Sequence, residues 1–205
     1  MSAAAFASIR SRIDAIVIGG SAGAIDGLGV LLPELCAGLP IPVFIVVHLP
    51  RNRSSLLVEI FEAKCPLRVR EAEDKEPVEP GTVYFAPPDY HLLVDQGPRL
   101  ALSADETVHF SRPSIDVLFE SAADAYRDRL MGIILSGANE DGADGLRAVH
   151  RAGGVTVVQA PEGAQSPHML TAALKLTNAD FVLPLNQIAA LLRSLGGATP
   201  VAPSP

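Results

Sequence analysis

The stretch AIVIGGSAGAIDGL, residues 15–28, decides how the rest of the sequence is interpreted. Four apolar residues run into two glycines, then Ser21 and a further glycine, and an amphipathic stretch follows. This order predicts a buried strand, a tight turn and a helix. Glycines on both sides of Ser21 permit a turn that lifts the serine oxygen clear of the backbone.

The glycine loop is compatible with more than one role. The G-x-G-x-x-G pattern of dinucleotide loops fails, because positions 19, 21 and 24 carry Gly, Ser and Ala, and the P-loop pattern also fails. The G-x-S-x-G pattern of exposed nucleophiles fits residues 19–23, and the helix start behind it offers free N–H groups for an oxyanion. A serine at a helix start is also a common N-cap, so both roles stay open for Ser21 here.

Short β-branched runs alternate with longer helical patterns along the chain. We predict strands at 15–19, 43–48, 83–87, 131–136, 155–160 and 181–184, and helices at 24–35, 54–64, 114–128, 142–153, 168–177 and 186–196. Near-continuous apolar strands separated by helices predict an α/β fold, a doubly wound, mostly parallel sheet with helices on both faces.

One section breaks this alternation. Between residues 67 and 103, short strands are joined by Pro, Gly and Asp turns, which predicts an antiparallel hairpin excursion from the main sheet. No internal repeat or linker divides the chain. We therefore expect an N-terminal lead-in over 1–13, one domain over 14–196 and a flexible tail over 197–205.

The composition excludes several classes of protein. The 205 residues carry a net charge of −7, with 5% aromatic residues and no Trp, which argues against nucleic acid as a partner. No apolar run reaches transmembrane length, so we expect no membrane insertion. The two cysteines lack metal-binding spacing, and no EF-hand or HExxH pattern is present, so we predict no metal and no cofactor.

Three predicted strands end near chemically reactive residues. Ser21 follows the strand at 15–19, His48 closes the strand at 43–48, and Asp141 comes soon after the strand at 131–136. Sites in doubly wound sheets form at the carboxyl ends of the strands. We therefore expect these three residues to converge on one edge of the sheet.

His48 is well placed for acid–base chemistry. It ends a buried strand, and Pro50 restricts the turn that follows, so the imidazole is held close to water. A half-exposed structural histidine is the alternative. The competing histidines are His91, His109, His150 and His168.

Asp141 lies in the segment SGANEDGADGL, residues 136–146, which opens a helix. An aspartate there has the right chemistry to orient a histidine and stabilise its cation. The alternatives are a helix cap or a turn residue, and Glu140 and Asp144 have equal claims by composition.

The chain order of the three residue types limits the choice. An α/β-hydrolase runs Ser, acid, His, an order met by Ser21, Asp141 and either His150 or His168. That fold places several strands before its serine, whereas only 20 residues precede Ser21. We therefore prefer the set Ser21, His48 and Asp141.

Six stretches in order make the chain resemble a known family, the catalytic domain of the CheB chemotaxis protein-glutamate methylesterases. They are IGGSAG (18–23), VVHLP (46–50), GTVYFAPPDYHLLV (81–94), SRPSIDVLFESAA (111–123), ILSGANEDGADGL (134–146) and QAPEGAQSPHM (159–169). The resemblance implies a nucleophile at Ser21, a general base at His48 and an aspartate partner at Asp141, without a cofactor. Backbone amides near Ser21 and in the 137–142 loop are the candidate oxyanion donors.

The resemblance also implies a substrate and a location. The family hydrolyses γ-glutamyl methyl esters on the cytoplasmic helices of chemoreceptors, and many members also deamidate glutamines there. A cytoplasmic enzyme with methylated receptor helices as its partners is therefore expected. Arg51, Arg53 and Arg112 lie in loops expected to border the cleft, where they would meet acidic receptor helices or simply be solvated.

The sequence departs from the family pattern at several positions. Ala24 replaces the second glycine of the serine loop, Val47 replaces a glutamine before the histidine, and positions 138–139 lack the usual methionine and glycine. A family Met-Pro pair appears as Met169-Leu170. A divergent substrate or rate is the expectation from these changes.

The start of the chain differs from that of many family members, which carry a receiver domain before the esterase. This chain enters its first strand within 14 residues, so we expect either a stand-alone catalytic domain or a piece of a longer protein. A stand-alone enzyme would be ungated or regulated by a receiver-domain protein in trans. Two other functions stay open: a non-catalytic CheB-like binding module in a chemosensory pathway, and a serine esterase for small molecules.

Overall fold

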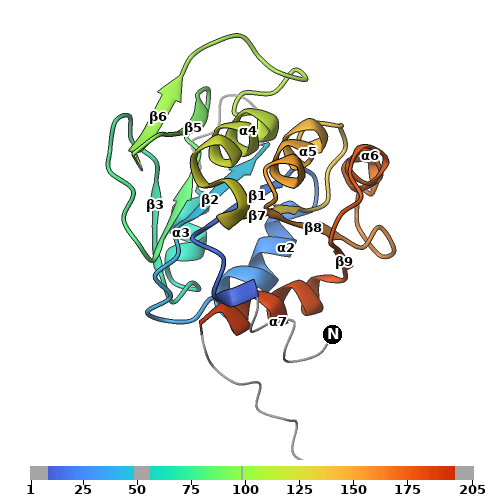
Figure 1. Cartoon of the computed structure of the whole chain (residues 1–205), viewed down its shortest axis with the longest axis horizontal. Helices are drawn as coiled ribbons and strands as arrows, with labels where there is room; N and C mark the ends of the chain where they lie inside the picture. The colour runs from blue at the N-terminus through green and yellow to red at the C-terminus, as the bar shows by residue number, and fades with distance from the viewer. Residues whose placement is uncertain (1–8, 49–55, 98, 197–205) are drawn as a thin grey trace, which may run out of the picture.

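A seven-stranded parallel sheet forms the centre of the structure, a computed structural model that describes residues 9–48, 56–97 and 99–196 (Figure 1). The strands are β1 (Ala15–Gly20), β2 (Val43–Val47), β3 (Arg68–Glu71), β4 (Thr82–Phe85), β7 (Leu130–Ile134), β8 (Val155–Gln159) and β9 (Phe181–Leu183). Their order across the sheet is β3-β4-β2-β1-β7-β8-β9, and every pairing along it is parallel. The prediction of a parallel α/β sheet is confirmed.

Helices cover both faces of the sheet, as Figure 1 shows. They are α2 (Ala24–Leu31), α3 (Leu57–Glu62), α4 (Ile115–Tyr126), α5 (Ala143–Arg151), α6 (His168–Leu176) and α7 (Leu185–Leu195). Alternate side chains of β1 explain the two layers, because Ile16 and Ile18 join the core under α2, α3 and α7. Ala15 and Val17 join the core under α4, α5 and α6.

The predicted hairpin excursion is shorter than expected. An antiparallel pair, β5 (His91–Asp95) with β6 (Arg99–Ser103), packs against α4 outside the main sheet. The earlier part of the segment was predicted wrongly, because Arg68–Glu71 pairs in parallel with β4 at the edge of the main sheet. Helix α3 returns the chain to the start of that edge, which makes the parallel pairing possible.

Two predicted element ends shift for local reasons. The helix predicted at 24–35 stops at Leu31 and continues as a 3₁₀ turn, Leu32–Glu34, which contains Pro33. The strand predicted at 83–87 ends at Phe85, since the prolines that follow cannot donate ladder hydrogen bonds. The start of the helix predicted at 54–64 lies outside the described residues.

Close packing of α4 on α5 depends on Gly145. A Cβ atom added there would lie 2.6 Å from the Cβ of Phe119 and 3.0 Å from the Cα of Asp116. We expect Gly145→Ala to lower the free energy of unfolding by about 1–3 kcal/mol, because the helices have to move apart. Urea unfolding followed by circular dichroism measures this.

Gly29→Ala in α2 is the matched control. Nothing lies within 4 Å of the added Cβ atom at that position. The change is therefore expected to raise stability by up to about 1 kcal/mol, since alanine favours a helix over glycine. Equal effects of the two substitutions would contradict the packing argument.

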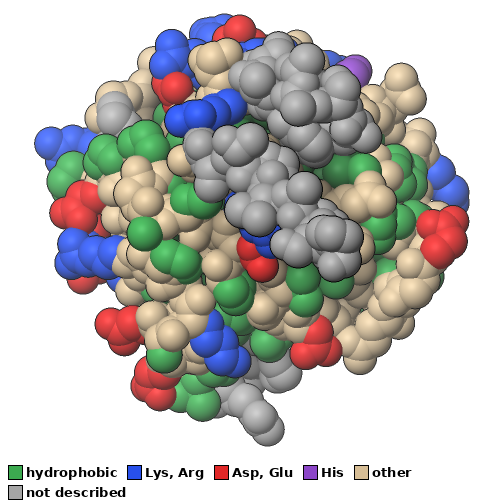
Figure 2. All heavy atoms as spheres, turned by 90° about the horizontal axis from the view of Figure 1, so that it is seen from below, with side chains coloured by type: hydrophobic (Ala, Val, Ile, Leu, Met, Phe, Trp, Pro, Cys, Tyr) green, Lys and Arg blue, Asp and Glu red, His purple; other side chains and the backbone are tan. Residues whose placement is uncertain are grey.

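No helix among the described residues is long and apolar enough to cross a membrane. On the face seen in Figure 2, acidic and basic side chains are interspersed, and no continuous basic surface is visible among the described residues. This distribution agrees with the net charge of −7.

Candidate active site

Neighbouring strands bring the predicted residues to one edge of the sheet. Strand β1 lies between β2 and β7, and its last residues pair with Val47 and Ile134. The backbone N–H of His48 donates to the carbonyl of Gly20 at 3.1 Å, so His48 starts beside the turn that carries Ser21. The predicted convergence at the carboxyl ends is therefore what the strand order produces.

Ser21 begins the tight turn between β1 and α2. Its backbone N–H donates to the carbonyl of Ser136 at 2.9 Å, and its own carbonyl accepts from Ala24 at 3.0 Å. Gly23 has a φ of +82° and is the N-cap residue of α2, which has no side-chain cap. Ser21 is thus not the helix cap, and the alternative left open by the sequence is excluded.

Ser136 holds the loops around this turn together. Its hydroxyl donates to the carbonyl of Ala22 at 2.7 Å and accepts from the backbone N–H of Ser166 at 3.0 Å. The side chain is buried at the end of β7. The glycine loop is therefore fixed to the loop before α6 as well as to the sheet.

His48 and Asp141 form a buried pair across the edge of the sheet. Nε2 of His48 lies 2.8 Å from Oδ2 of Asp141, and the exposed fractions of the two side chains are 11% and 0%. The partly exposed imidazole faces solvent while the carboxylate is shielded from it. This pairing matches the predicted partnership of the two residues.

The carboxylate of Asp141 also accepts hydrogen bonds from the start of α4. Oδ2 accepts from the backbone N–H of Ile115 at 2.8 Å, and Oδ1 accepts from Asp116 N–H at 3.1 Å and from the Ser114 hydroxyl at 2.8 Å. Burial raises the pKa of Asp141, but the hydrogen bonds from His48 and from Ile115 and Asp116 outweigh it, so the pKa is lowered. The carboxylate is therefore the charged partner that a histidine cation requires.

Asp116 makes the reciprocal contact with the start of α5. Its Oδ1 accepts from the backbone N–H groups of Gly142 at 2.9 Å and Gly145 at 2.6 Å. The start of α4 thus contacts the carboxylate of Asp141, which precedes α5. The start of α5 contacts the carboxylate of Asp116, which lies in the first turn of α4. Burial, reinforced by the charge of Asp141, raises the pKa of Asp116 to about 7 against these hydrogen bonds.

The raised pKa of Asp116 predicts a pH-dependent stability. The folded protein retains a proton that the unfolded chain releases near pH 3.8, so stability falls as pH rises from about 4 through about 7. Asp116→Asn keeps the acceptor oxygen without the charge. We expect urea unfolding to show a loss of roughly 2–4 kcal/mol in the wild type over this range, and none in Asp116→Asn.

Asp124→Asn, at an exposed position of α4, serves as the control for this measurement. It is expected to follow the wild-type profile at every pH. A profile of Asp116→Asn that parallels the wild type would contradict the assignment of the fall to Asp116.

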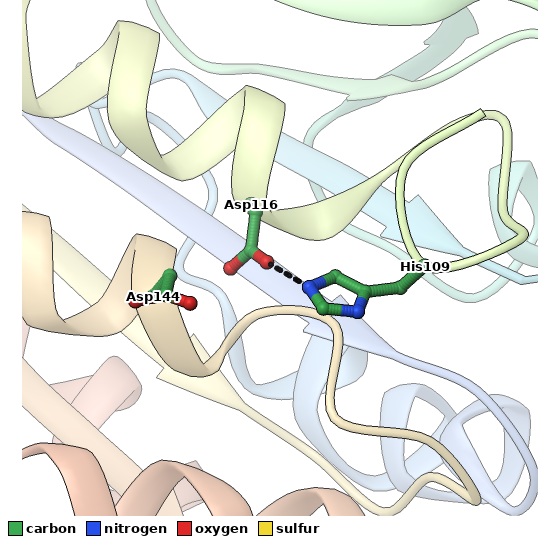
Figure 3. A group of neighbouring side chains, drawn as sticks. All are labelled: His109, Asp116 and Asp144. Atoms are coloured by element: carbon green, nitrogen blue, oxygen red, sulfur yellow. Dashed lines mark ion pairs between the residues drawn. The ribbon is translucent and has the colours of Figure 1, made fainter. Parts of the chain in front are cut away.

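The other acids near the loop have partners away from His48. Nε2 of His109 lies 3.4 Å from Oδ2 of Asp116, a contact drawn as a dashed line in Figure 3, and its Nδ1 lies 3.7 Å from Glu140. Asp144 pairs with Arg147 on the same helix. His109, Glu140 and Asp144 line one side of a cavity of about 280 Å³, with His168 and α6 opposite. These pairings leave Asp141 as the acid that contacts His48.

The donor atoms of His109, Asp116 and Asp144 lie within 4.8 Å of one another. Each of the three side chains already has a neighbouring partner, because His109 and Asp116 face each other and Asp144 faces Arg147. These contacts account for the group by ion pairing and hydrogen bonding alone.

His91 and Arg112, two further candidates from the sequence, have local partners. Nδ1 of buried His91 accepts from the backbone N–H of Ser114 at 3.1 Å, which supports the start of α4. Arg112 donates to the carbonyls of Ala104 and Asp105 at 2.8 and 2.9 Å. Its guanidinium therefore faces the β5–β6 side. Arg51 and Arg53 lie outside the described residues.

Sequence reasoning missed the residues that support Asp141. Ser114 and Asp116 belong to the quoted stretch SRPSIDVLFESAA, but nothing in the pattern tied them to a loop 25 residues away. The usable signal was Ser114 directly before a helical pattern, which predicts an N-cap. Its hydroxyl does accept from Val117 N–H at 3.4 Å.

A serine in a glycine turn lies beside a histidine–aspartate pair at adjacent strand ends of a parallel sheet, and these are the residue types of a serine-hydrolase triad. The chain belongs to the CheB methylesterase family, whose model, described as CheB methylesterase, matches residues 16–192. The resemblance predicted from the sequence is confirmed.

Similar proteins support this membership. A protein of Leptospira interrogans (strain Fiocruz L1-130), named putative protein-glutamate methylesterase/protein-glutamine glutaminase, is 46% identical over 87% of this chain and 92% of its own. A relative in Symbiobacterium thermophilum, named protein-glutamate methylesterase/protein-glutamine glutaminase, is 37% identical over 88% of this chain, which spans 50% of that longer protein.

A solved structure has the same fold. The crystal structure of the Thermotoga maritima CheB methylesterase catalytic domain matches with a TM-score of 0.84 and 31% identity. The match covers 89% of this chain and 98% of that one. The doubly wound fold with its added hairpin is therefore the fold of this family.

Proposed function

We propose that this protein is a serine esterase that hydrolyses γ-glutamyl methyl esters of chemoreceptors. Ser21 is the nucleophile, His48 the general base and Asp141 the partner that orients and balances the imidazole. The observation that carries the proposal is the 2.8 Å contact between His48 and Asp141 beside the turn of Ser21. The names of the relatives supply the substrate class.

The position of the proton on the His48 ring determines which nitrogen acts as the base in the proposed mechanism. Because Nε2 of His48 donates to ionised Asp141, Nδ1 is left as the basic nitrogen. Nδ1 takes the hydroxyl proton of Ser21 while the serine oxygen bonds to the ester carbonyl carbon. The C–OCH₃ bond then breaks, and the methoxyl oxygen takes the proton from Nδ1 and leaves as methanol.

Water completes the cycle through the same nitrogen. Nδ1 of His48 removes a proton from water as the water oxygen bonds to the acyl carbon. The bond to Ser21 breaks, and its oxygen takes the proton back. The product is a free glutamate side chain, which ionises in solution.

The backbone bonds narrow the choice of oxyanion donors. The N–H groups of Ser21, Gly137 and Gly142 already donate to Ser136, Ser166 and Asp116. In the described part of the chain, the N–H groups of Ala22 and Gly23 donate no hydrogen bond, and neither do those of residues 138–141. These amides remain the candidate donors, a type of contact worth about 3–4 kcal/mol in other hydrolases.

Glutamine deamidation is a second candidate activity. It uses the same steps with a C–N bond broken and ammonia as the leaving group, and the relatives' names include glutaminase. The substrate helices of both reactions are the cytoplasmic helices of chemoreceptors, so we place the protein in the cytoplasm.

Methanol release tests the proposal. A receptor cytoplasmic fragment carrying radiolabelled methyl esters is incubated with the protein, and volatile methanol is counted. A fluorophosphonate probe, applied in parallel, reports an activated serine without a receptor. Labelling without methanol release would favour an esterase for other substrates. The absence of both labelling and methanol release would favour a non-catalytic binding module.

A further inference from the structure

The hydroxyl of Ser111 lies beside the basic nitrogen of His48. Its Oγ is 3.5 Å from Nδ1, the nitrogen that does not face Asp141. Within the described part of the chain, the nitrogens of the imidazole lie within hydrogen-bond distance of these two side chains, and neither lies so close to Ser21. The resting ring is therefore held by Asp141 on one side and has the Ser111 oxygen beside its other nitrogen.

The other contacts of Ser111 prepare its oxygen to accept a hydrogen bond. Its hydroxyl lies 3.4 Å from the backbone carbonyl of His109, to which it donates. Its oxygen accepts from Nδ2 of Asn139 at 3.3 Å. With the proton directed at the carbonyl, one lone pair of Ser111 remains for an N–H at Nδ1 of His48.

The side-chain amide of Asn139 adopts an orientation that leaves a buried oxygen unpaired while its nitrogen contacts Ser111. Its Oδ1 is buried and has no hydrogen-bond partner among the described residues, whereas its Nδ2 donates to Ser111. A buried acceptor without a donor is destabilising, and folded proteins contain few such groups. The orientation of the amide thus serves Ser111 at the expense of its own oxygen.

An N–H at Nδ1 exists only after His48 has taken a proton. Asp141 accepts a hydrogen bond from the N–H at Nε2. The neutral ring therefore has no proton at Nδ1, and the cation has an N–H there. A hydrogen bond from a cation is stronger than one between neutral groups. Ser111 therefore favours the protonated ring, the form generated when Ser21 attacks, over the resting one.

We infer that Ser111, oriented by Asn139, is a positioning residue that fixes the His48 ring and shares its Nδ1 proton while that proton is in transit. Ser111 itself gains and loses no proton. The proton moves from the Ser21 oxygen to Nδ1 and on to the leaving group, as in the proposed function on which this inference rests. No residue of the predicted triad is replaced.

The rate of fluorophosphonate labelling of Ser21, measured across pH in the full-length protein, tests this role without a receptor. Ser111→Ala is expected to slow labelling about tenfold. The pH at which the labelling rate reaches half its maximum on the acidic side is expected to be lower in this variant, because the His48 cation loses a hydrogen-bond acceptor. Ser111→Thr, which keeps the oxygen, is expected to restore both, and Asn139→Ala to show a smaller loss in the same direction.

Ser103→Ala is the matched control, since its hydroxyl contacts Asp105 in the exposed hairpin. Wild-type rates and pH profiles in both Ser111→Ala and Asn139→Ala would overturn the inference, and so would an unlabelled wild type. If Ser111→Ala does not fold, Asn139→Ala and Ser111→Thr still decide. If the probe labels the wild-type protein but the protein releases no methanol, the proposed substrate is wrong, whereas the labelling test of Ser111 still applies.

Discussion

Ser21→Ala is expected to reduce methanol release by at least about 1,000-fold while leaving the melting temperature unchanged. Removing the nucleophile of a serine hydrolase abolishes the acyl-enzyme route and leaves only the small acceleration from binding and oxyanion contacts. Stability is preserved because the contacts of Ser21 run through its backbone, to Ser136 and from Ala24. Single-turnover methanol release and thermal unfolding measure the two quantities.

Ser194→Ala is the control for this substitution. Among the described residues, that hydroxyl bonds to the carbonyl of Leu191 within α7, which packs in the core layer under α2, α3 and α7. Activity close to the wild-type value is expected. Residual activity of Ser21→Ala above about a tenth of wild type would transfer the nucleophile's role to another hydroxyl, and Ser111 beside Nδ1 of His48 is the first to examine.

Asp141→Asn is expected to damage both the chemistry and the fold. Each carboxylate oxygen accepts one backbone N–H of α4, from Ile115 or Asp116. An asparagine keeps one oxygen, so whichever way its amide turns, one backbone N–H faces an NH₂ group. We expect a loss of about 2–4 kcal/mol in the free energy of unfolding, measured by urea denaturation.

The catalytic effect of Asp141→Asn follows from the histidine tautomer. An NH₂ group facing Nε2 of His48 makes that nitrogen the acceptor and moves the ring proton to Nδ1, where the base is needed. We expect kcat to fall by about 1,000- to 10,000-fold in protein that circular dichroism shows to be folded.

Glu140→Gln tests whether any neighbouring charge would have the same effect. Glu140 precedes Asp141 directly, and 66% of its side chain is exposed. It is expected to keep wild-type stability and activity within about twofold. A fall of similar size in both variants would contradict the specific role of the buried carboxylate.

The sheet and its three reactive strand ends were predictable from the sequence. Buried parallel strands read as continuous apolar runs, and the ends of such strands are where side chains meet at one edge. In the sequence, Ser21 and His48 stand at the ends of their predicted strands, and Asp141 follows soon after the third strand. The order of strands was not predictable in this way, because it depends on which apolar faces pack together.

The support around Asp141 was not predictable, for a different physical reason. Asp116 has the position of an ordinary first-turn acid, which is normally solvated. It is buried here because Gly145 lets α4 and α5 approach closely. Ser111 and Asn139 likewise acquire a role only through the fold that places them beside His48.

The reciprocal contacts of Asp116 and Asp141 also determine how the protein comes apart. Helix ends ordinarily fray first, because their amides lack partners. The initial amides of α4 are held by Asp141, which precedes α5, and those of α5 are held by Asp116 of α4, so neither end can fray alone. The two helices and the His48–Asp141 pair therefore open as one cooperative unit, and the site stays assembled for as long as these helices stay docked.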